Sequence, residues 1–249
     1  MTASFPDHFS SVAANYARYR PTYPAQLFDW IASVAPATDA AWDCGCGNGQ
    51  ATLPLAERFD RVFATDPSAQ QIAEAPRHPR ITWSVAPAEA SGLHDASVDA
   101  VTVAQALHWF DLAKFWNEVR RVVRPGGLVA TWMYGVPFSD DADTTRVLRQ
   151  FHDEGIGAYW PLERGYITNR YDQIDFPFGR IEAPHFELAA DWTLEQLTGY
   201  LRTWSAVRRY IQANGGDPVS SVEAALRPGW GTTRIVRWPV TLVAGRVYR

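Results

Sequence analysis

The sequence predicts an α/β fold: a doubly wound, mostly parallel sheet with an antiparallel final strand. An apolar run at 40–42 ends in an acid, a glycine-rich turn follows it, and a helix-like segment covers 51–59. Further apolar runs alternate with helical segments, which is typical of a parallel sheet covered on both faces. These runs are 61–65, 80–86, 97–104 and 128–133, and the β-rich stretch 234–247 suits the closing antiparallel strand.

Helix signals follow the same order along the chain. We expect helices from about Ser10 to Tyr19, over 25–34, and over about 138–154, 193–213 and 218–226. Ser68, Asp111 and Thr193 are suited to cap helices. We expect one domain with four regions: an N-terminal segment with a leading helix (1–36), a core (37–134), an aromatic insert after the fifth strand (135–190), and C-terminal helices with closing strands (191–249).

Composition bounds the class of protein. The chain has 249 residues, 47% of them hydrophobic, which suffices for a large core, and its net charge of −4 argues against a nucleic-acid partner. No apolar run is long enough for a membrane span, and no signal-peptide core is visible. Cys44 and Cys46 are the only cysteines, with no second pair to complete a zinc site. We therefore expect a cytoplasmic protein without a metal, a monomer or homodimer.

The glycine-rich turn carries the strongest chemical signal. After Asp43, glycines occur at the alternate positions Gly45, Gly47 and Gly49, which differs from the G-x-G-x-x-G spacing of dinucleotide sites. An acid before the first glycine would repel a pyrophosphate and suit a positively charged ligand. Such a turn lies at the carboxyl edge of a parallel sheet, where ligands bind. A tight turn that needs glycine for its geometry alone remains the alternative.

This turn resembles motif I of the class I S-adenosylmethionine-dependent methyltransferases (methyltransferase type 11 domain), which have a Rossmann-like, seven-stranded sheet. Asp66-Pro67-Ser68 and the Arg-Pro-Gly-Gly run at 124–127 strengthen a resemblance that covers about residues 8–134. The runs Tyr-Arg-Pro-Thr-Tyr-Pro (19–24) and Gln-Ala-Leu-His-Trp-Phe (105–110) make the chain similar, more finely, to the trans-aconitate methyltransferase-like small-molecule group. The resemblance implies S-adenosylmethionine as cofactor, S-adenosylhomocysteine as product and a small-molecule acceptor. It also implies that region 1–36 includes a lid, that 37–134 is the cofactor-binding core and that the insert 135–190 determines substrate specificity. The aromatic N-terminal segment could equally be a staple that packs the first helix onto the sheet.

Cofactor-binding residues follow from both arguments. An acid ending the second strand, as Asp66 does, is placed to bind ribose hydroxyls. The resemblance implies that the glycines enclose the methionine part near Asp43, and that Gln71, Ala88 and Glu89 meet the adenine. An Asp-Pro turn and a surface-loop glutamate are the simpler alternatives for Asp66 and Glu89. The expected set is Tyr16, Arg20, Asp43, Gly45, Cys46, Gly47, Gly49, Gln50, Asp66, Pro67, Gln71, Ala88, Glu89, Gln105 and Ala106.

The acceptor is less defined. His108 is the only histidine at the expected cofactor edge and the candidate base, with Trp109 as an apolar wall; both could instead be structural. A carboxylate acceptor needs no base, whereas an alcohol or amine does. Arginines binding a carboxylate would be found among Arg20, Arg170, Arg208 and Arg209. We expect a carboxylate acceptor, with Tyr19, Trp109, Arg170, Trp204 and Arg208 as substrate residues. The alternatives are a hydroxyl, amine or carbon acceptor with His108 as base, a non-catalytic cofactor-binding protein, or a nicotinamide oxidoreductase, which the glycine spacing disfavours.

Overall fold

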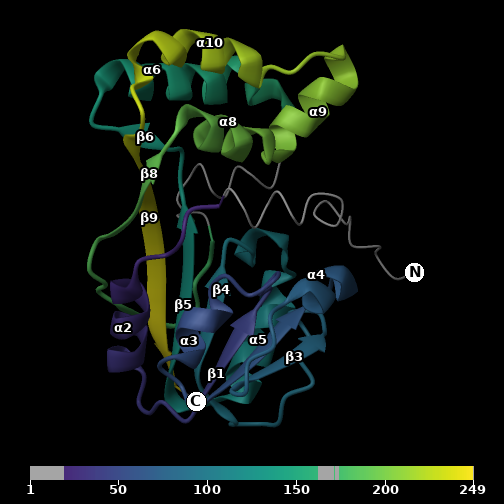
Figure 1. Cartoon of the computed structure of the whole chain (residues 1–249). Coiled ribbons are helices and arrows are strands. Elements are labelled where there is room, and N and C mark those ends of the chain that lie inside the picture. The colour runs from purple at the N-terminus through teal and green to yellow at the C-terminus, as the bar shows by residue number, and fades with distance from the viewer. Residues whose placement is uncertain (1–19, 162–170, 172–173, 249) are drawn as a thin grey trace.

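The computed structural model describes residues 20–161, 171 and 174–248. Within them one nine-stranded sheet has the order β3-β2-β1-β4-β5-β9-β6. Its principal strands are β1 (Ala40–Cys44), β2 (Arg61–Asp66), β3 (Ile81–Val85), β4 (Val98–Ala104), β5 (Val123–Tyr134) and β9 (Arg234–Val247). β1 to β5 are parallel, and β9 runs antiparallel to β5 (Figure 1). The predicted Rossmann-like α/β fold with an antiparallel final strand is confirmed.

Helices cover both faces of this sheet. They are α2 (Ala25–Val34), α3 (Thr52–Ala56), α4 (Ala69–Glu74) and α5 (Leu112–Val122). Successive strand residues point to opposite faces, so Ala41 packs into the core under α2 and α3 while Trp42 packs into the core under α5. The apolar face of α5 places Phe115 and Val119 in this second core. The two cores fix the carboxyl ends of the strands, which carry the site.

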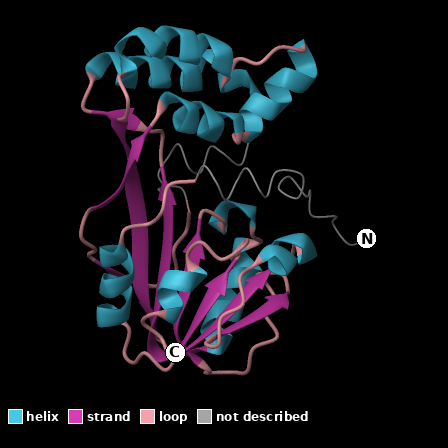
Figure 2. Cartoon of the chain, in the orientation of Figure 1, coloured by secondary structure: helices cyan, strands magenta, loops and turns pink. Residues whose placement is uncertain are grey.

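A second group of helices lies beyond those carboxyl ends, and we call it the helical layer (Figures 1 and 2). It consists of α6 (Ala142–Gln150), α8 (Leu194–Arg202), α9 (Ser205–Asn214) and α10 (Val219–Trp230), with a π-helical turn (Phe151–Gly155) and a 3₁₀ turn (Gly157–Tyr159) after α6. A capping box at Thr193 starts α8, as its N-terminal signal predicted.

One strand joins the helical layer to the core. The second half of β9 pairs with β5 and with β7 (Gly179–Ile181), and its first half pairs with β6 (Phe138–Ser139) and β8 (Phe186–Trp192). These short strands raise the count of described strands to nine, where the family resemblance implied seven. Trp238, near the middle of β9, is fully buried.

Four helix predictions were wrong at their boundaries. The segment expected at 51–59 is helical only over Thr52–Ala56, and the helix expected at 218–226 continues to Trp230. The helix expected at 138–154 begins only at Ala142, because Phe138 and Ser139 pair with β9. The helix expected at 193–213 is two helices, because Trp204 takes an extended conformation (φ −68°, ψ 136°) between α8 and α9. The turn expected at 124–127 lies within the range of β5, at an irregularity in its pairing with β4. The helix expected near Ser10–Tyr19 falls outside the described residues.

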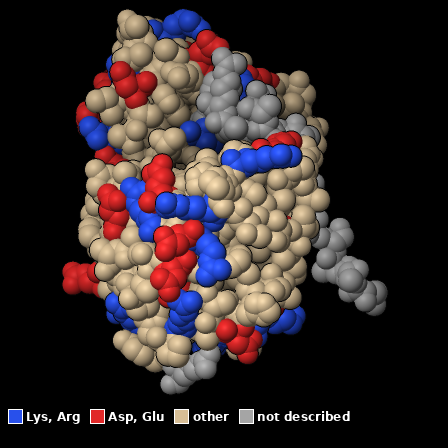
Figure 3. Space-filling model, turned by 60° about the horizontal axis from the view of Figure 1, so that its bottom comes forward, with Lys and Arg blue, Asp and Glu red and all other residues tan. Residues whose placement is uncertain are grey.

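The face at the amino ends of the strands carries interleaved charges. Arg124 pairs with Asp39 and Asp99, and Arg121 pairs with Glu118 and Asp95. Figure 3 shows the two signs mixed on this side of the molecule. No helix in the described part of the chain is long and apolar enough to cross a membrane. The same residues contain no cluster of three or more side chains suited to hold a metal ion.

Candidate active site

The glycine turn has a backbone that only glycine adopts easily. Gly45, Gly47 and Gly49 have φ values of +68°, +55° and +97°. A Cβ on Gly45 would lie 2.7 Å from the Ala106 side chain, and one on Gly49 would lie 2.4 Å from the Trp83 ring. A Cβ on Gly47 would meet nothing closer than 3.7 Å. The outer glycines therefore pack the turn against the protein, while the middle one borders open space.

Asp66, at the end of β2, is bonded to this turn. Its Oδ2 accepts from the Gly47 N–H and its Oδ1 from the Ser68 N–H, both at 2.9 Å. An ionised carboxylate has about four acceptor positions. Asp66 thus stabilises the turn and the start of α4, and it also lines the cavity at this edge of the sheet.

These residues border a cavity at the carboxyl edge of the sheet. Its volume is about 130 Å³, which is smaller than the roughly 300–1,000 Å³ of typical small-molecule sites, and it opens to solvent. The lining residues are Tyr23, Gly45, Cys46, Gly47, Asn48, Gln50, Ala51, Asp66, Pro67, Ser68, Gln71, Ala104, Gln105, Ala106, Trp109, Phe110 and Tyr134. Gln105 has φ +56°, held by bonds to the Trp132 and Tyr134 carbonyls. Such strained residues concentrate at functional sites.

Asp43 lies behind the turn and is fully buried. Its carboxylate accepts hydrogen bonds from Thr52 Oγ1 at 2.6 Å and Thr102 Oγ1 at 2.9 Å. Desolvation raises the pKa of Asp43 to about 6, against the lowering effect of these two bonds, and the negative Asp66 raises it further. Asp43 therefore joins α3 and β4 beneath the turn and supplies negative charge there without lining the cavity.

Comparison with known proteins decides the family. Residues 42–131 match the model of a methyltransferase domain. A Dictyostelium discoideum protein named as a methyltransferase is 34% identical over 232 residues, covering 92% of this chain and 88% of its own. One from Saccharomyces cerevisiae, named as an S-adenosylmethionine-dependent methyltransferase, is 32% identical over 83% of each chain. A solved structure assigned to the type II methyltransferases, from Anaeromyxobacter dehalogenans, is 45% identical with a TM-score of 0.88, covering 92% of this chain and 99% of that one.

The chain belongs to the S-adenosylmethionine-dependent methyltransferases. S-adenosylmethionine is accordingly the cofactor of this methyltransferase. The lining of the cavity suits this ligand chemically, because the Asp66 carboxylate, the backbone of the glycine turn and apolar side chains lie around one space. The cofactor supplies a methyl group on a positively charged sulfur. Asp66 would bind its ribose, and the turn would lie along its methionine part.

Most of the predicted cofactor residues of this methyltransferase meet at the cavity. Those that line it are Gly45, Cys46, Gly47, Gln50, Asp66, Pro67, Gln71, Gln105 and Ala106, together with Trp109. Gly49 instead supports the turn against Trp83, Glu89 accepts from the Asp111 N–H at 2.8 Å, and Ala88 packs in the core under α5. Tyr16, Tyr19 and Arg170 lie outside the described residues. The binding roles of all these residues remain proposals.

Several lining residues were absent from the predicted set: Tyr23, Asn48, Ala51, Ser68, Ala104, Phe110 and Tyr134. Ser68 and Phe110 adjoin predicted residues, so a wider window around each motif would have included them. Tyr134 is the last residue of β5 and could have been found from the rule that parallel strands deliver ligand contacts at their carboxyl ends. Nothing in the local sequence indicates its contacts.

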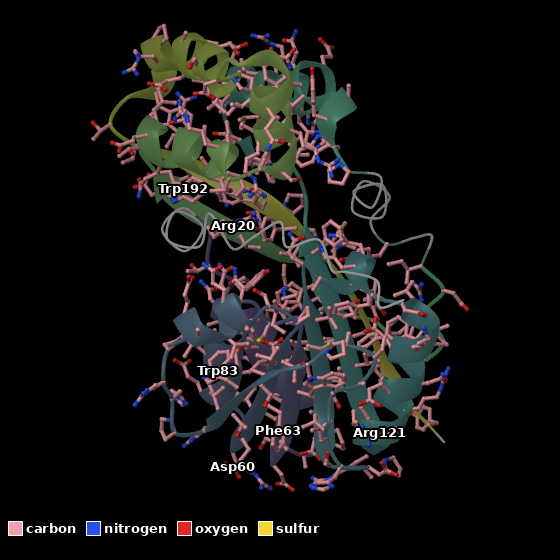
Figure 4. The ribbon with its side chains drawn as sticks, turned by 90° about the vertical axis from the view of Figure 1, so that its right-hand side faces the viewer. Arg20, Asp60, Phe63, Trp83, Arg121 and Trp192 are labelled. Atoms are coloured by element: carbon pink, nitrogen blue, oxygen red, sulfur yellow. The ribbon has the colours of Figure 1, made fainter. Side chains whose placement is uncertain are left out.

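The remaining predicted residues lie around the cavity or away from it. His108 Nδ1 is 3.2 Å from the Tyr171 hydroxyl, and its ring is 4.9 Å from that of Trp109. Arg20 donates to the Tyr134 hydroxyl, and its guanidinium lies 5.6 Å from the Tyr200 ring centre. Trp204 is buried within the helical layer, and Arg208 is half-buried on α9. Figure 4 shows Arg20 between the helical layer and the core.

Proposed function

We propose that this methyltransferase methylates a carboxylate oxygen of a small-molecule acid. The observation that carries the proposal is the position of Arg20. Its guanidinium is held by Tyr134, which lines the cofactor cavity, and by Tyr200 of the helical layer. A fixed cation beside the cavity suits an anionic acceptor, because guanidinium binds carboxylate with two parallel hydrogen bonds. Arg20 could serve the cofactor's own carboxylate instead, and the two roles make different predictions.

The chemistry requires alignment more than proton transfer. A carboxylate oxygen forms the new bond to the methyl carbon while the carbon–sulfur bond breaks and its electron pair stays on sulfur. No proton is released, since the acid is already ionised near neutral pH. The contribution of the protein is to orient the two reactants and exclude water. The contact of His108 with Tyr171, and its position outside the cavity lining, support chemistry without a base.

The first experiment is calorimetric titration with S-adenosylhomocysteine, comparing the intact protein with Asp66→Asn. We expect binding to weaken about 10- to 100-fold in the variant, because a bond to a charged acceptor contributes about 1.5–3 kcal/mol. Lys114→Gln, which alters an exposed side chain paired with Asp111, is the matched control and should bind normally. Unchanged binding in Asp66→Asn would remove the proposed ribose contact.

The second experiment offers small acids, alcohols and amines and detects methyl esters, ethers and methylamines. Esters should predominate, and His108→Ala should keep most of the kcat on acids. Arg20→Lys should raise KM for the acid with little change in S-adenosylhomocysteine affinity; the reverse pattern would assign Arg20 to the cofactor. An activity confined to alcohols or amines and lost in His108→Ala would replace the carboxylate proposal with base catalysis by His108, which adjoins the cavity-lining Trp109.

A further inference from the structure

One edge of the sheet has no neighbouring strand in the described part of the chain. β3 is the last strand on its side, and among the described strands it pairs only with β2 (Figure 1). The other connections between successive parallel strands contain α3, α4 or α5, whereas residues 86–97, which join β3 to β4, contain no helix. No crossover helix after β3 therefore covers the sheet beside this edge.

The surface beside β3 carries no charged side chains. A hollow of about 580 Å³ lies there, lined in part by Phe63, Thr82 and Ser84, and none of its lining residues is a Lys, Arg, Asp or Glu. Val85 is 55% exposed, more than any other valine, leucine or isoleucine in the described residues. Edge strands are usually protected by a charge, a proline or a bulge, and β3 has none of these. Such an edge is suited to a partner.

The backbone of β3 presents hydrogen-bonding groups at this edge. On the inner side, the Arg80 carbonyl accepts from the Val62 N–H at 2.8 Å. The N–H and C=O groups of one strand residue point to the same side, and successive residues alternate between the two sides. The even-numbered residues of β3 therefore bond β2. Trp83 and Val85 direct their backbone groups outward, where another strand can bond them.

The side chains of β3 have the same chemical order in both directions along the strand. The order is apolar, hydroxyl, aromatic, hydroxyl, apolar, from Ile81, Thr82, Trp83, Ser84 and Val85. When a second copy of the strand pairs antiparallel about Trp83, Ile81 lies opposite Val85, and Thr82 lies opposite Ser84. Matched cross-strand pairs are the unit by which antiparallel strands stabilise each other. This register also brings the outward backbone groups of Trp83 opposite those of its symmetry mate.

We propose that β3 forms the interface of a homodimer, in which two copies of this chain pair through antiparallel β3 strands about a twofold axis at Trp83. A twofold interface must be self-complementary, and an uncharged surface meets its own copy without burying an unpaired ion. The symmetric order of side chains favours a second copy over an extended segment of a different protein, which needs no such symmetry. Because the Trp83 ring lies against Gly49, the interface adjoins the glycine turn of both copies.

Sedimentation of the full chain between about 1 and 200 µM tests for this dimer, because an interface built on a five-residue strand is expected to be weak. The average mass should rise with concentration toward twice that of the monomer. Val85→Lys places a charge opposite the apolar Ile81 and should raise the dissociation constant about tenfold or more. Ile235→Lys is the matched control, since Ile235 is 44% exposed on β9, and it should leave the dimer unchanged. A monomer at every concentration, or equal effects of the two lysines, would overturn the proposal.

Disulfide formation between copies tests the register and does not depend on the lysine variants. In the proposed register the Cα atoms of Thr82 and Ser84 of opposite copies are about 4.5 Å apart, within the range that a disulfide spans. The double variant Thr82→Cys/Ser84→Cys should therefore give covalent dimers with glutathione disulfide, visible on a non-reducing gel. Ser84→Cys alone has no cysteine opposite it and is the control, and the native Cys44 and Cys46 are buried. No covalent dimer from the double variant, or equally fast dimer formation by the single one, would overturn the proposed pairing.

Discussion

The glycine turn and the helical layer achieve rigidity by different means. The turn depends on backbone geometry: glycines at positive φ, an acid bonded to main-chain N–H groups, and close approach of Trp83 to Gly49. The helical layer depends on side-chain packing, and the Trp204 ring contacts four other rings, those of Phe151, His152, Trp160 and Tyr200. The residues of the glycine turn lie close together in the sequence, whereas those of the helical layer come from distant segments. The two regions can therefore be perturbed separately by substitution.

The largest expected effect is on the stability of the helical layer, where a substitution should destabilise the protein without changing its affinity for the cofactor. Trp204→Ala should lower the free energy of unfolding by about 3–5 kcal/mol, because it removes a buried aromatic side chain and leaves a cavity. Urea unfolding measures the loss, and calorimetry in the absence of urea should give nearly unchanged S-adenosylhomocysteine affinity. Loss of binding in a folded variant would show that the two regions are energetically coupled.

A pair of glycines gives the next comparison. Gly49→Ala should lower the free energy of unfolding by about 2–4 kcal/mol, because the alanine would have a strained φ and its Cβ would overlap the Trp83 ring. It should also weaken S-adenosylhomocysteine binding by about tenfold or more. Gly215→Ala, at φ +76° after α9, has open space around the added Cβ and should cost only about 1–2 kcal/mol without affecting binding. Equal binding by the two variants would contradict the role of the turn.

The buried acid beneath the turn predicts a pH dependence. The pKa of Asp43 is about 6 in the folded protein against 3.8 for the ordinary carboxyl group, so the folded state holds a proton between these values that the unfolded state has lost. This contribution therefore favours folding at low pH and is lost as pH rises from about 4 to about 6. As pH rises from 4 to 8, the free energy of unfolding of Asp43→Asn should increase by up to about 3 kcal/mol relative to that of the natural protein, because the variant has no group that loses a proton there. Parallel stability curves for the two proteins would show that Asp43 does not titrate in this range.

Helix caps give the smallest effects. Ser68 Oγ accepts from the Gln71 N–H at 3.4 Å, and Thr193 Oγ1 accepts from the Gln196 N–H at 3.3 Å. Ser68→Ala and Thr193→Ala should each destabilise the protein by about 1 kcal/mol in thermal or urea unfolding. Only Ser68→Ala should also weaken cofactor binding, since Ser68 and Gln71 line the cavity. A matching loss in Thr193→Ala would mean that the helical layer positions the cofactor.

The parts predicted from sequence are those that local rules determine. The helix at 25–34 and the strand at 234–247 have the expected boundaries, and Ser68, Asp111 and Thr193 cap helices. The three glycines of the turn and the acid at the end of the second strand can be recognised from the local sequence, without knowledge of the tertiary contacts. The same rules placed most of the cavity-lining residues.

The rest depends on contacts that no local pattern encodes. The break between α8 and α9 has no glycine or proline; it exists because Trp204 leaves helical geometry to bury its ring. The pairing of Phe138 and Ser139 with β9 is decided by a strand far along the chain. Asp43 was expected beside the ligand, yet the burial that raises its pKa comes from α3 and β4 packing together over it.

Because β9 joins residues as distant as Ala130 and Ala244, it also determines when the protein can finish folding. Until it docks, β5 presents an apolar strand with an unpaired edge, which is a template for aggregation. In the folded protein β9 covers that edge and also pairs with β6, β7 and β8. Pairings of such long range are slow to form, so the interval before β9 docks is when the nascent chain most needs protection from other chains.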